Sequence, residues 1–198
     1  DNKYIFYSKL DKHHRPRKIF RHKLGSPIKE DQLIFEEKSE AFTVGIGQSS
    51  DEKYFFISTS DHNTSEQYYF DVNEEKPKPK LIQKRKKGII YSVNSWYGFF
   101  YKHTNEDAED FKIDRCKNLA EQKWEIFIPA KNEVLIGGLV FLKDWIIRSE
   151  ISNAIGKLIL RDPKTNNEEE IIFSDEKVIV PSISLMQKDK DTNLVYLS

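Results

Sequence analysis

The sequence predicts an all-β protein, a partial β-propeller of about four blades, each a four-stranded antiparallel sheet, with incomplete blades at both ends. The first observation is a repeat, because three segments begin at a polar turn, continue through apolar and aromatic residues, and recur at a period of roughly 45 residues. These segments are residues 53–58, 97–102 and 143–148. The second observation is the aromatic content of 13%, since aromatic residues favour strands. No apolar period of 3.6 residues is sustained, so little helix is expected, with residues 105–110 as the candidate for one helical turn.

Short apolar runs separated by polar turns divide the chain into about seventeen expected strands. They lie at residues 4–10, 17–24, 33–37, 42–48, 53–60, 66–72, 80–84, 89–95, 98–102, 110–115, 124–128, 134–142, 145–149, 156–161, 169–173, 178–185 and 193–197. Grouped in fours, these strands predict the blades and their boundaries. The prediction is a partial blade at residues 1–38, full blades at 39–85, 86–130 and 131–174, and a second partial blade at 175–198.

Turn residues and glycines agree with this division into blades. Polar turn clusters separate the expected strands at residues 49–51, 61–65 and 163–167. The expected first strands of two blades carry glycine pairs, Gly45 with Gly47 and Gly137 with Gly138. In a propeller the first strand lies nearest the axis, and glycine inside a strand often marks the close approach of another backbone. A bulge at an ordinary sheet edge is the open alternative.

Charge and composition narrow the classes of function. The 198 residues include 32 basic and 32 acidic side chains, so the formal net charge is zero and no global field attracts nucleic acid or an anionic membrane. Cys116 is the only cysteine, which excludes an intrachain disulfide and fits a reducing, cytoplasmic compartment. No apolar stretch is long enough to span a membrane. Because the chain starts without Met and directly in an expected strand, we expect that it was cut from a larger protein.

The sequence contains no recognisable catalytic or cofactor motif. The nucleophile elbow Gly-x-Ser-x-Gly is absent, since its nearest match, residues 47–51, lacks the second glycine and a following helix and reads as a hairpin turn. The Gly45-Ile46-Gly47 segment lacks the third glycine of a dinucleotide-binding fingerprint. We therefore expect no catalytic residue and no cofactor site in this chain.

The histidines do not predict a metal site. Zinc requires ligands that converge at tetrahedral spacing, whereas the adjacent His13 and His14 would point apart on an extended segment. His62 beside Asp61 reads as turn chemistry, and the remaining histidines, His22 and His103, lie apart in the sequence. No metal is expected.

Two basic runs, residues 76–80 and 84–87, could form a nucleic-acid patch. No stacking aromatic motif accompanies them, and acidic runs at residues 74–75 and 168–170 balance their charge. Solvated loops between blades, with lysines that protect edge strands from unwanted pairing, are the favoured interpretation. No nucleic-acid partner is expected.

One hairpin carries a specific family resemblance. After Asp11 and a short polar turn, the chain reads Arg15-Pro16, a hydrophobic pair, and then Arg21-His22-Lys23-Leu24-Gly25. This segment resembles the oligopeptidase B branch of the prolyl oligopeptidase family of serine peptidases. The resemblance continues in collinear order at residues 55–58, 64–66 and 104–111. The chain departs from the family at Glu109-Asp110, where Lys-Asn is frequent, and at residues 94–98, and from Ile151 onward only the strand pattern matches.

The resemblance implies a lid for a peptidase rather than the catalytic machinery itself. Family members place a seven-bladed propeller over an α/β-hydrolase domain, which carries the Ser, Asp and His and the acidic pocket that selects Arg or Lys. Those catalytic residues lie beyond the position that matches Ser198, so none is transferred to this chain, which should be inactive alone. The implied partners are the hydrolase domain of the parent protein and short basic peptides as its substrates. The implied role of the propeller is to gate access to the active site.

Arg15 and Glu66 are the two residues we single out as candidates for an interdomain or turn-fixing role. A partly buried ion pair within one blade is the alternative interpretation for them. The alternative function for the whole chain is a stand-alone propeller-like module that binds a protein partner and has no enzymatic activity. Exposed edge strands at either end would also recruit other chains, so a dimer is expected.

Overall fold

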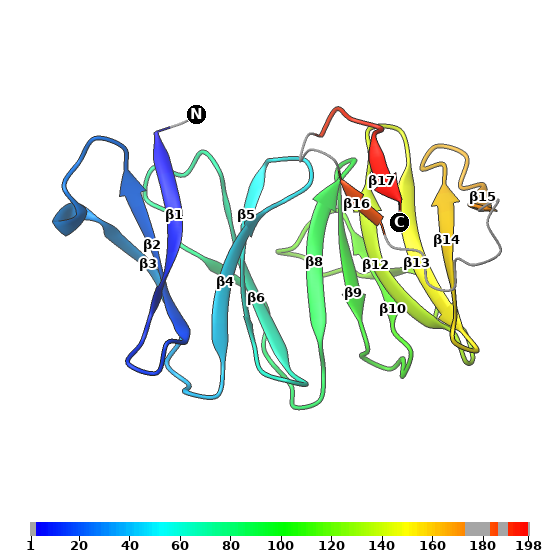
Figure 1. Ribbon diagram of the computed structural model, residues 1–198, viewed down its shortest axis with the longest axis horizontal. Coiled ribbons are helices and arrows are strands. Elements are labelled where there is room, and N and C mark those ends of the chain that lie inside the picture. The colour runs from blue at the N-terminus through cyan, green and yellow to red at the C-terminus, as the bar shows by residue number, and fades with distance from the viewer. Residues whose placement is uncertain (1–2, 173–182, 186–189, 198) are drawn as a thin grey trace. The chain divides into compact units, whose positions relative to one another are not determined.

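The computed structural model describes residues 3–172, 183–185 and 190–197, and its described part is built almost entirely from antiparallel strands (Figure 1). The chain divides into two compact units, Asp1–Ser95 and Trp96–Ser198, and each is described by itself. No helix among the described residues is long and apolar enough to cross a membrane. The all-β class predicted from the sequence is confirmed.

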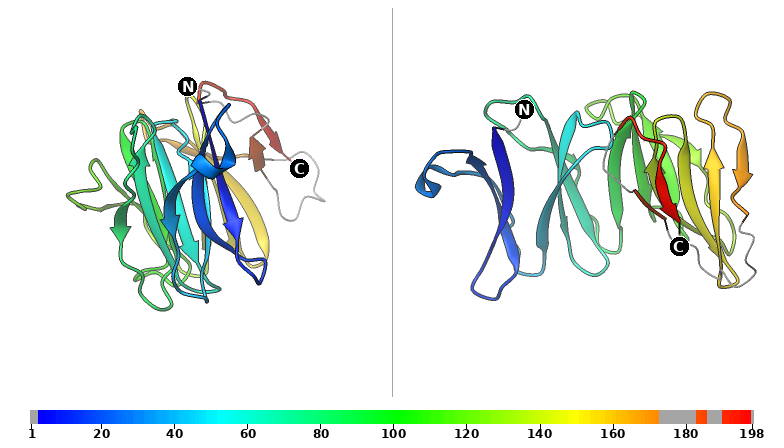
Figure 2. Two further views of the ribbon diagram at one scale, coloured as in Figure 1. Left: turned by 90° about the vertical axis from the view of Figure 1, so that its left-hand side faces the viewer. Right: turned by 45° about the horizontal axis from the view of Figure 1, so that its top comes forward.

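The first unit contains a three-stranded sheet of order β1-β2-β3 and a four-stranded sheet of order β4-β5-β6-β7. Its strands are β1 (Tyr4–Leu10), β2 (Pro16–Lys23), β3 (Gln32–Glu36), β4 (Thr43–Gln48), β5 (Tyr54–Ser60), β6 (Ser65–Asp71) and β7 (Lys80–Gln83). β8 (Tyr91–Trp96) follows at the boundary between the units. Figure 2 shows the sheets of this unit from two further sides, as twisted layers of neighbouring strands.

The second unit continues with a sheet of order β11-β10-β9-β8 and a four-stranded sheet of order β12-β13-β14-β15, followed by the β16-β17 pair. Its strands are β9 (Phe99–Thr104), β10 (Lys112–Cys116), β11 (Glu125–Ile128), β12 (Leu135–Phe141), β13 (Ile146–Ser152), β14 (Ile155–Arg161), β15 (Glu168–Glu170), β16 (Ile183–Leu185) and β17 (Val195–Leu197). Most of the expected strands are present with ends that differ by a few residues. Of the strand expected at 178–185, residues 178–182 lie outside the described residues.

The repeat identified in the sequence occupies the same place in three sheets. Residues 53–58, 97–102 and 143–148 lead into or lie within β5, β9 and β13, each the second strand along the chain in its sheet. Such a strand has a neighbour on both sides and apolar contacts on both faces, so it must be apolar at consecutive positions. β9 shows this directly, because Phe100, Tyr101 and Lys102 are buried one after another. The shared pattern therefore reflects the second strand of each sheet.

Two apolar cores position these sheets. In the first unit, Ile19 from β2 packs with Val44, Ile57 and Phe70 from the neighbouring sheet. In the second unit, residues of β9 to β11 pack against β12 and β13. That core consists of Trp96, Tyr101, Ile113, Phe127, Ile128, Ile136, Phe141 and Ile146. The other face of the β12–β15 sheet carries a smaller cluster of Leu142, Ile147 and Leu158.

Aspartates close several of the turns, as the polar clusters in the sequence predicted. The Asp61 carboxylate accepts hydrogen bonds from the backbone N–H groups of Asn63 and Thr64, and Asp162 accepts them from Lys164 and Thr165. This geometry is an Asx turn, which gives the reversing chain a local acceptor. The Asp61-His62 pair is thus turn chemistry, as expected.

The candidate helical turn was placed wrongly. Residues 105–110 form turns, because Asp107 and then Phe111 adopt positive φ values of 54° and 66°, which a right-handed helix does not allow. The described helix is a short 3-10 turn, η1 (Ile28–Glu30), which begins directly after Pro27. Proline presets the φ angle needed to enter such a turn.

The glycine pairs differ from one another. The pairing of β12 with β13 shifts register between Ile136 and Leu139, so Gly137 and Gly138 form a bulge. A Cβ atom at Gly137 would lie 2.0 Å from the Ser149 hydroxyl oxygen on the neighbouring strand. A Cβ atom at Gly45 or Gly47 would meet nothing within 4 Å. At the second pair the bulge is accompanied by a close backbone, because the Ser149 carbonyl oxygen lies 3.0 Å from the Cβ position of Gly137, and no close backbone is found among the described residues at the first pair.

Candidate functional site

The two residues singled out in the sequence occupy different environments. Arg15 lies in the exposed turn between β1 and β2, where its backbone N–H donates to the Asp11 carboxylate and its guanidinium donates to the Glu40 carbonyl at 2.9 Å. Glu66 lies in β6 and is only 4% exposed. They contact different partners, and the buried Glu66 belongs to a cluster of charged side chains.

Arg85 is the centre of this first-unit cluster, which we call the Arg85 cluster (Glu37, Glu66, Tyr68 and Arg85). The Arg85 Nη2 atom donates to Glu37 Oε2 at 2.7 Å and to Glu66 Oε1 at 3.0 Å. The Arg85 backbone N–H donates to Glu66 Oε2 at 2.8 Å, and the Tyr68 hydroxyl donates to Glu66 Oε1 at 2.7 Å. Glu66 thus accepts three hydrogen bonds, and Arg85 links two buried carboxylates.

The charges of the Arg85 cluster stabilise one another against burial. Burial alone would raise the pKa of the Glu66 carboxyl, but the hydrogen bonds from Arg85 and Tyr68 outweigh it and hold the pKa below its usual value. Burial and the bond to Glu66 raise the pKa of the Tyr68 hydroxyl. The Arg85 guanidinium also lies 4.0 Å from the centre of the Phe42 ring, a cation–π contact. Glu66 and Arg85 therefore stay ionised near neutral pH.

This cluster fixes the connections between strands of the first unit. Glu37 directly follows β3, Glu66 lies in β6, and Arg85 follows β7, so one guanidinium holds together segments of two sheets. Arg17 adds to the same connection, because it donates to the carbonyl oxygens of Ser39 and Phe42 in the segment between β3 and β4. These hydrogen bonds and ion pairs make the connection between the two sheets of the first unit rigid.

A second cluster, which we call the Arg148 cluster (Arg148, Glu150, Arg161 and Glu168), lies within the β12–β15 sheet. Arg148 donates to Glu150 at 2.7 Å and through two nitrogens to Glu168 at 2.6 and 2.8 Å. Arg161 also donates to Glu168, and Lys131 donates to Glu150. Burial would lower the pKa of the Arg148 guanidinium, but the two carboxylates raise it overall.

The remaining candidate side chains are held by internal partners. His22 bonds to Asp31 at 2.7 Å, and His103 bonds through Nε2 to the Ile136 carbonyl at 2.7 Å while its ring stacks on Phe111. Burial raises the pKa of the Cys116 thiol to about 11, so this cysteine is not a reactive thiolate. Within the described residues, no three His, Cys, Asp or Glu side chains are placed to hold a metal ion.

Sequence reasoning missed Arg85 because it lies in a basic run that reads as a solvated loop. The structure places its guanidinium against two carboxylates that are each 4–5% exposed. One signal was present in the sequence, since Arg85 is the only arginine among lysines in that run. Arginine is the cation that suits buried ion pairs. Arg148 gave a similar signal, as a charged residue directly after apolar Trp145-Ile146-Ile147.

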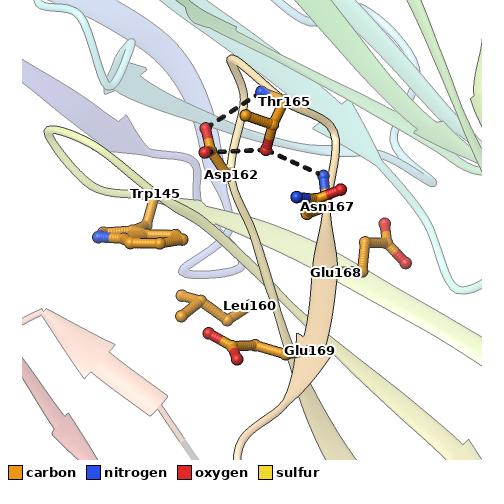
Figure 3. A pocket seen from close by; sticks show the side chains of 7 residues that line it. All are labelled: Trp145, Leu160, Asp162, Thr165, Asn167, Glu168 and Glu169. Carbon is orange, nitrogen blue, oxygen red and sulfur yellow. Dashed lines mark hydrogen bonds between the residues drawn. The ribbon is translucent and has the colours of Figure 1, made fainter.

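A pocket of about 260 Å³ lies at the hairpin between β14 and β15 (Figure 3). Its lining consists of Trp145, Leu160, Asp162, Thr165, Asn167, Glu168 and Glu169. In Figure 3 the Asp162 carboxylate is bonded to Thr165, whereas Glu169 lies beside Leu160 on the side of Trp145. This pocket combines an aromatic wall with carboxylates.

Solved structures define the class of protein to which this arrangement of sheets belongs. Oligopeptidase B from Trypanosoma brucei with covalently bound antipain, in its closed form, matches with a TM-score of 0.90 at 24% identity. The match covers 100% of this chain and 29% of that structure. A structure from an analysis of two prolyl endopeptidases matches with a TM-score of 0.74 at 18% identity, over 91% of this chain and 27% of that structure. The chain is therefore a partial β-propeller.

The family follows from the sequence comparison. The prolyl oligopeptidase N-terminal β-propeller domain matches residues 1–198, and the chain belongs to this family. Protease 2 of Moraxella lacunata is 35% identical over 147 residues, which cover 68% of this chain. The chain spans only 21% of that relative's length. The resemblance stated from the sequence is thereby confirmed.

Proposed function

We propose that this chain is a non-catalytic, gating segment of the propeller in a serine endopeptidase similar to oligopeptidase B, one that cleaves short peptides after Arg or Lys. The observation that carries the proposal is the match over the whole chain to an oligopeptidase B that holds a covalent ligand in a closed form. The prolyl endopeptidase structure comes from work on the role of inter-domain dynamics in catalysis and specificity. A closed form in one protein and a role for inter-domain dynamics in the other support the proposal that this segment belongs to a gate.

In this proposal the chemistry belongs to the α/β-hydrolase domain of the parent enzyme. A serine there attacks the peptide carbonyl, a histidine transfers the proton, and backbone donors stabilise the oxyanion. The propeller limits which substrates reach that serine, and closure excludes water and large proteins. The sheets of this chain are the proposed blades, with the divisions at residues 38, 85, 130 and 174 that the sequence predicts.

The contribution of this chain's own residues is rigidity. A gate that opens as a body must keep its blades together while the contact with the catalytic domain changes. The Arg85 cluster joins segments of two sheets and thereby serves that purpose in the first unit. Arg15, exposed and attached to the Glu40 carbonyl, is the better candidate of the two residues for a contact with another domain.

Hydrolysis assays test the proposal in two steps. The isolated chain should not cleave a fluorogenic peptide amide with Arg or Lys before the cleaved bond, and cleavage that a serine-directed inhibitor abolishes would contradict it. In the intact enzyme, Arg15→Ala should change turnover of long peptides more than of dipeptide substrates, with unchanged folding. Lys12→Ala in the same exposed turn is the matched control. If Arg15→Ala and Lys12→Ala changed the turnover of long peptides equally, Arg15 would have no specific role in gating.

The alternative, a stand-alone interaction module, makes a different prediction. It requires a specific protein partner and no Gly-x-Ser-x-Gly motif in the coding region that follows residue 198, whereas the peptidase requires that motif. Self-association through exposed edge strands also stays a prediction, and light scattering over a range of concentrations measures it.

A further inference from the structure

The hairpin of β14 and β15 presents its three glutamates to two different faces of the sheet. Leu160 pairs with Glu169, whereas Arg161 pairs with Glu168 and Ile159 with Glu170. Successive residues of a strand point to opposite faces. Glu169 therefore shares a face with Leu160, and Glu168 and Glu170 share the other.

The carboxylates on the two faces differ in their hydrogen-bond partners. Glu168 accepts hydrogen bonds from Arg148 and Arg161, and Glu170 accepts one from Lys157 at 2.9 Å. Among the described residues, none forms a hydrogen bond or an ion pair with the Glu169 carboxylate, although the backbone of Glu169 pairs with that of Leu160. Its face is otherwise apolar, because Leu160 and Trp145 pack against the cluster of Leu142, Ile147 and Leu158. Within the part of the chain that the structure describes, Glu169 is thus a carboxylate without a counter-ion, and it lies beside an aromatic side chain.

The pocket in Figure 3 gathers these groups around one space of about 260 Å³. Asp162 does not provide a second free carboxylate there, because its oxygens accept bonds from the Lys164 and Thr165 backbone and from the Thr165 hydroxyl. The indole ring of Trp145 is seen nearly edge-on, with Leu160 and Glu169 below it in this view. The space therefore offers an indole, an aliphatic wall and one available carboxylate.

We infer that this pocket binds an organic cation, the guanidinium or ammonium group of an Arg or Lys side chain. An indole ring attracts a cation through its quadrupole, and a carboxylate forms charge-assisted hydrogen bonds with it. The aliphatic stem of such a side chain packs against apolar groups such as Leu160 while its charged end stays polar. The volume is below the range of pockets for drug-sized ligands and suits a single side chain.

Other classes of ligand fit this pocket poorly. The Glu169 carboxylate would repel an anion, and a neutral apolar group would remove water from Glu169 without replacing its hydrogen bonds. The assignment of the cation to a peptide substrate rests on the proposed function. Binding of the cation itself does not, so the experiment measures binding directly and leaves peptide cleavage aside.

The test is a titration of the 198-residue chain with N-acetylarginine amide, followed through the indole N–H signals of its three tryptophans in ¹H–¹⁵N spectra. The Trp145 signal should shift with saturation, while the Trp96 and Trp124 signals stay in place. The Glu169→Gln variant should weaken binding about tenfold, because it loses one charge-assisted interaction of about 1.4 kcal/mol. The matched control is Glu170→Gln, one residue away on the opposite face, which should bind like the wild type.

A neutral probe completes the design. N-acetylcitrulline amide has nearly the same shape as N-acetylarginine amide but no charge, so it should bind at least about tenfold more weakly. Equal binding of the two probes, wild-type affinity in Glu169→Gln, or a Trp145 signal that does not shift with saturation would each overturn the inference. The spectra also report folding, so a variant that loses its dispersed signals is recognised at once and replaced by Glu169→Ala.

Discussion

Arg85 in the first unit and Arg148 in the second each neutralise two carboxylates, but they connect different parts of the fold. Arg85 joins Glu37, which follows β3, to Glu66 in β6, and so connects two sheets. Arg148 joins Glu150 of its own strand to Glu168 of β15 and stays within one sheet. In the second unit, β9 and β12 are instead connected by the neutral hydrogen bond from His103 to the Ile136 carbonyl.

The position of each arginine explains the difference. Arg148 lies in a central strand with a side chain only 3% exposed, so each of its polar groups needs a partner inside the sheet. Arg85 follows an edge strand, and its side chain is 25% exposed. It can therefore keep part of its guanidinium in water while one nitrogen contacts both carboxylates. A buried central arginine stabilises a sheet, and an arginine at the edge is free to join two.

The largest effect is expected from Arg148→Met. The change leaves the buried Glu150 and the partly exposed Glu168 with only Lys131 and Arg161 as partners, so the free energy of unfolding should fall by about 3 kcal/mol. Urea unfolding followed by tryptophan fluorescence measures it. Lys157→Met in the neighbouring strand removes an exposed ion pair and is the control, with an expected loss below about 1 kcal/mol. A similar loss in both variants would mean that burial does not distinguish Arg148.

The Arg85 cluster should show a smaller effect that depends on both carboxylates. Glu37→Gln or Glu66→Gln leaves Arg85 with one charged partner, and each should cost about 1–2 kcal/mol. Because both carboxylates share one Nη2 atom, the double variant should depart from the sum of the single losses by at least about 0.5 kcal/mol. Glu36→Gln, one residue earlier and exposed, is the control. Additive losses would show that Arg85 does not couple the two sheets.

Much of this fold could be predicted from the sequence because strand patterns and turn residues are local signals. The second strand of each sheet repeats its apolar run, and Asp61 and Asp162 form turns with their own neighbours. The helical turn expected at residues 105–110 was wrong because Asp107 and Phe111 adopt positive φ values. The apolar and polar pattern of these residues gave no sign of this backbone conformation. Local patterns determine strands but do not reveal a backbone conformation set by packing.

The charged clusters could not be predicted, for a different physical reason. Glu37 and Arg85 are 48 residues apart, and the local sequence around one residue does not indicate that it pairs with the other. Glu66 was among the residues singled out from the sequence, but its partner Arg85 lies in a run that resembles a solvated loop. Glu169 is a third case, because only strand pairing shows that it faces Trp145 rather than the arginines on the other face. Whether Arg15 or Glu66 has an interdomain role stays a prediction.

The smallest effect concerns pH and the neutral link in the second unit. Burial lowers the pKa of the His103 imidazole, although its bond to the Ile136 carbonyl acts in the opposite direction. The unfolded chain has an ordinary histidine pKa of about 6.5 and therefore binds the proton more readily than the folded chain. Stability should be complete above that pH and should fall as the pH drops through it toward the folded value. Glu66 of the Arg85 cluster should not respond in this window, because its hydrogen bonds hold its pKa below the usual value.

The links between the sheets of the two units therefore differ in how strongly they respond to acid near pH 6.5, and the His103→Gln variant tests this difference. Glutamine can still donate to the Ile136 carbonyl but does not titrate, so the difference in unfolding free energy between wild type and variant should change between pH 7.5 and pH 5.5, roughly one unit to either side of the unfolded histidine pKa. The matched control is His62→Gln, which makes the same substitution in the exposed turn after β5. A constant difference between wild type and His103→Gln over this range would show that His103 is not protonated on unfolding. The neutral link would then be no more sensitive to acid than the ion pairs of the first unit.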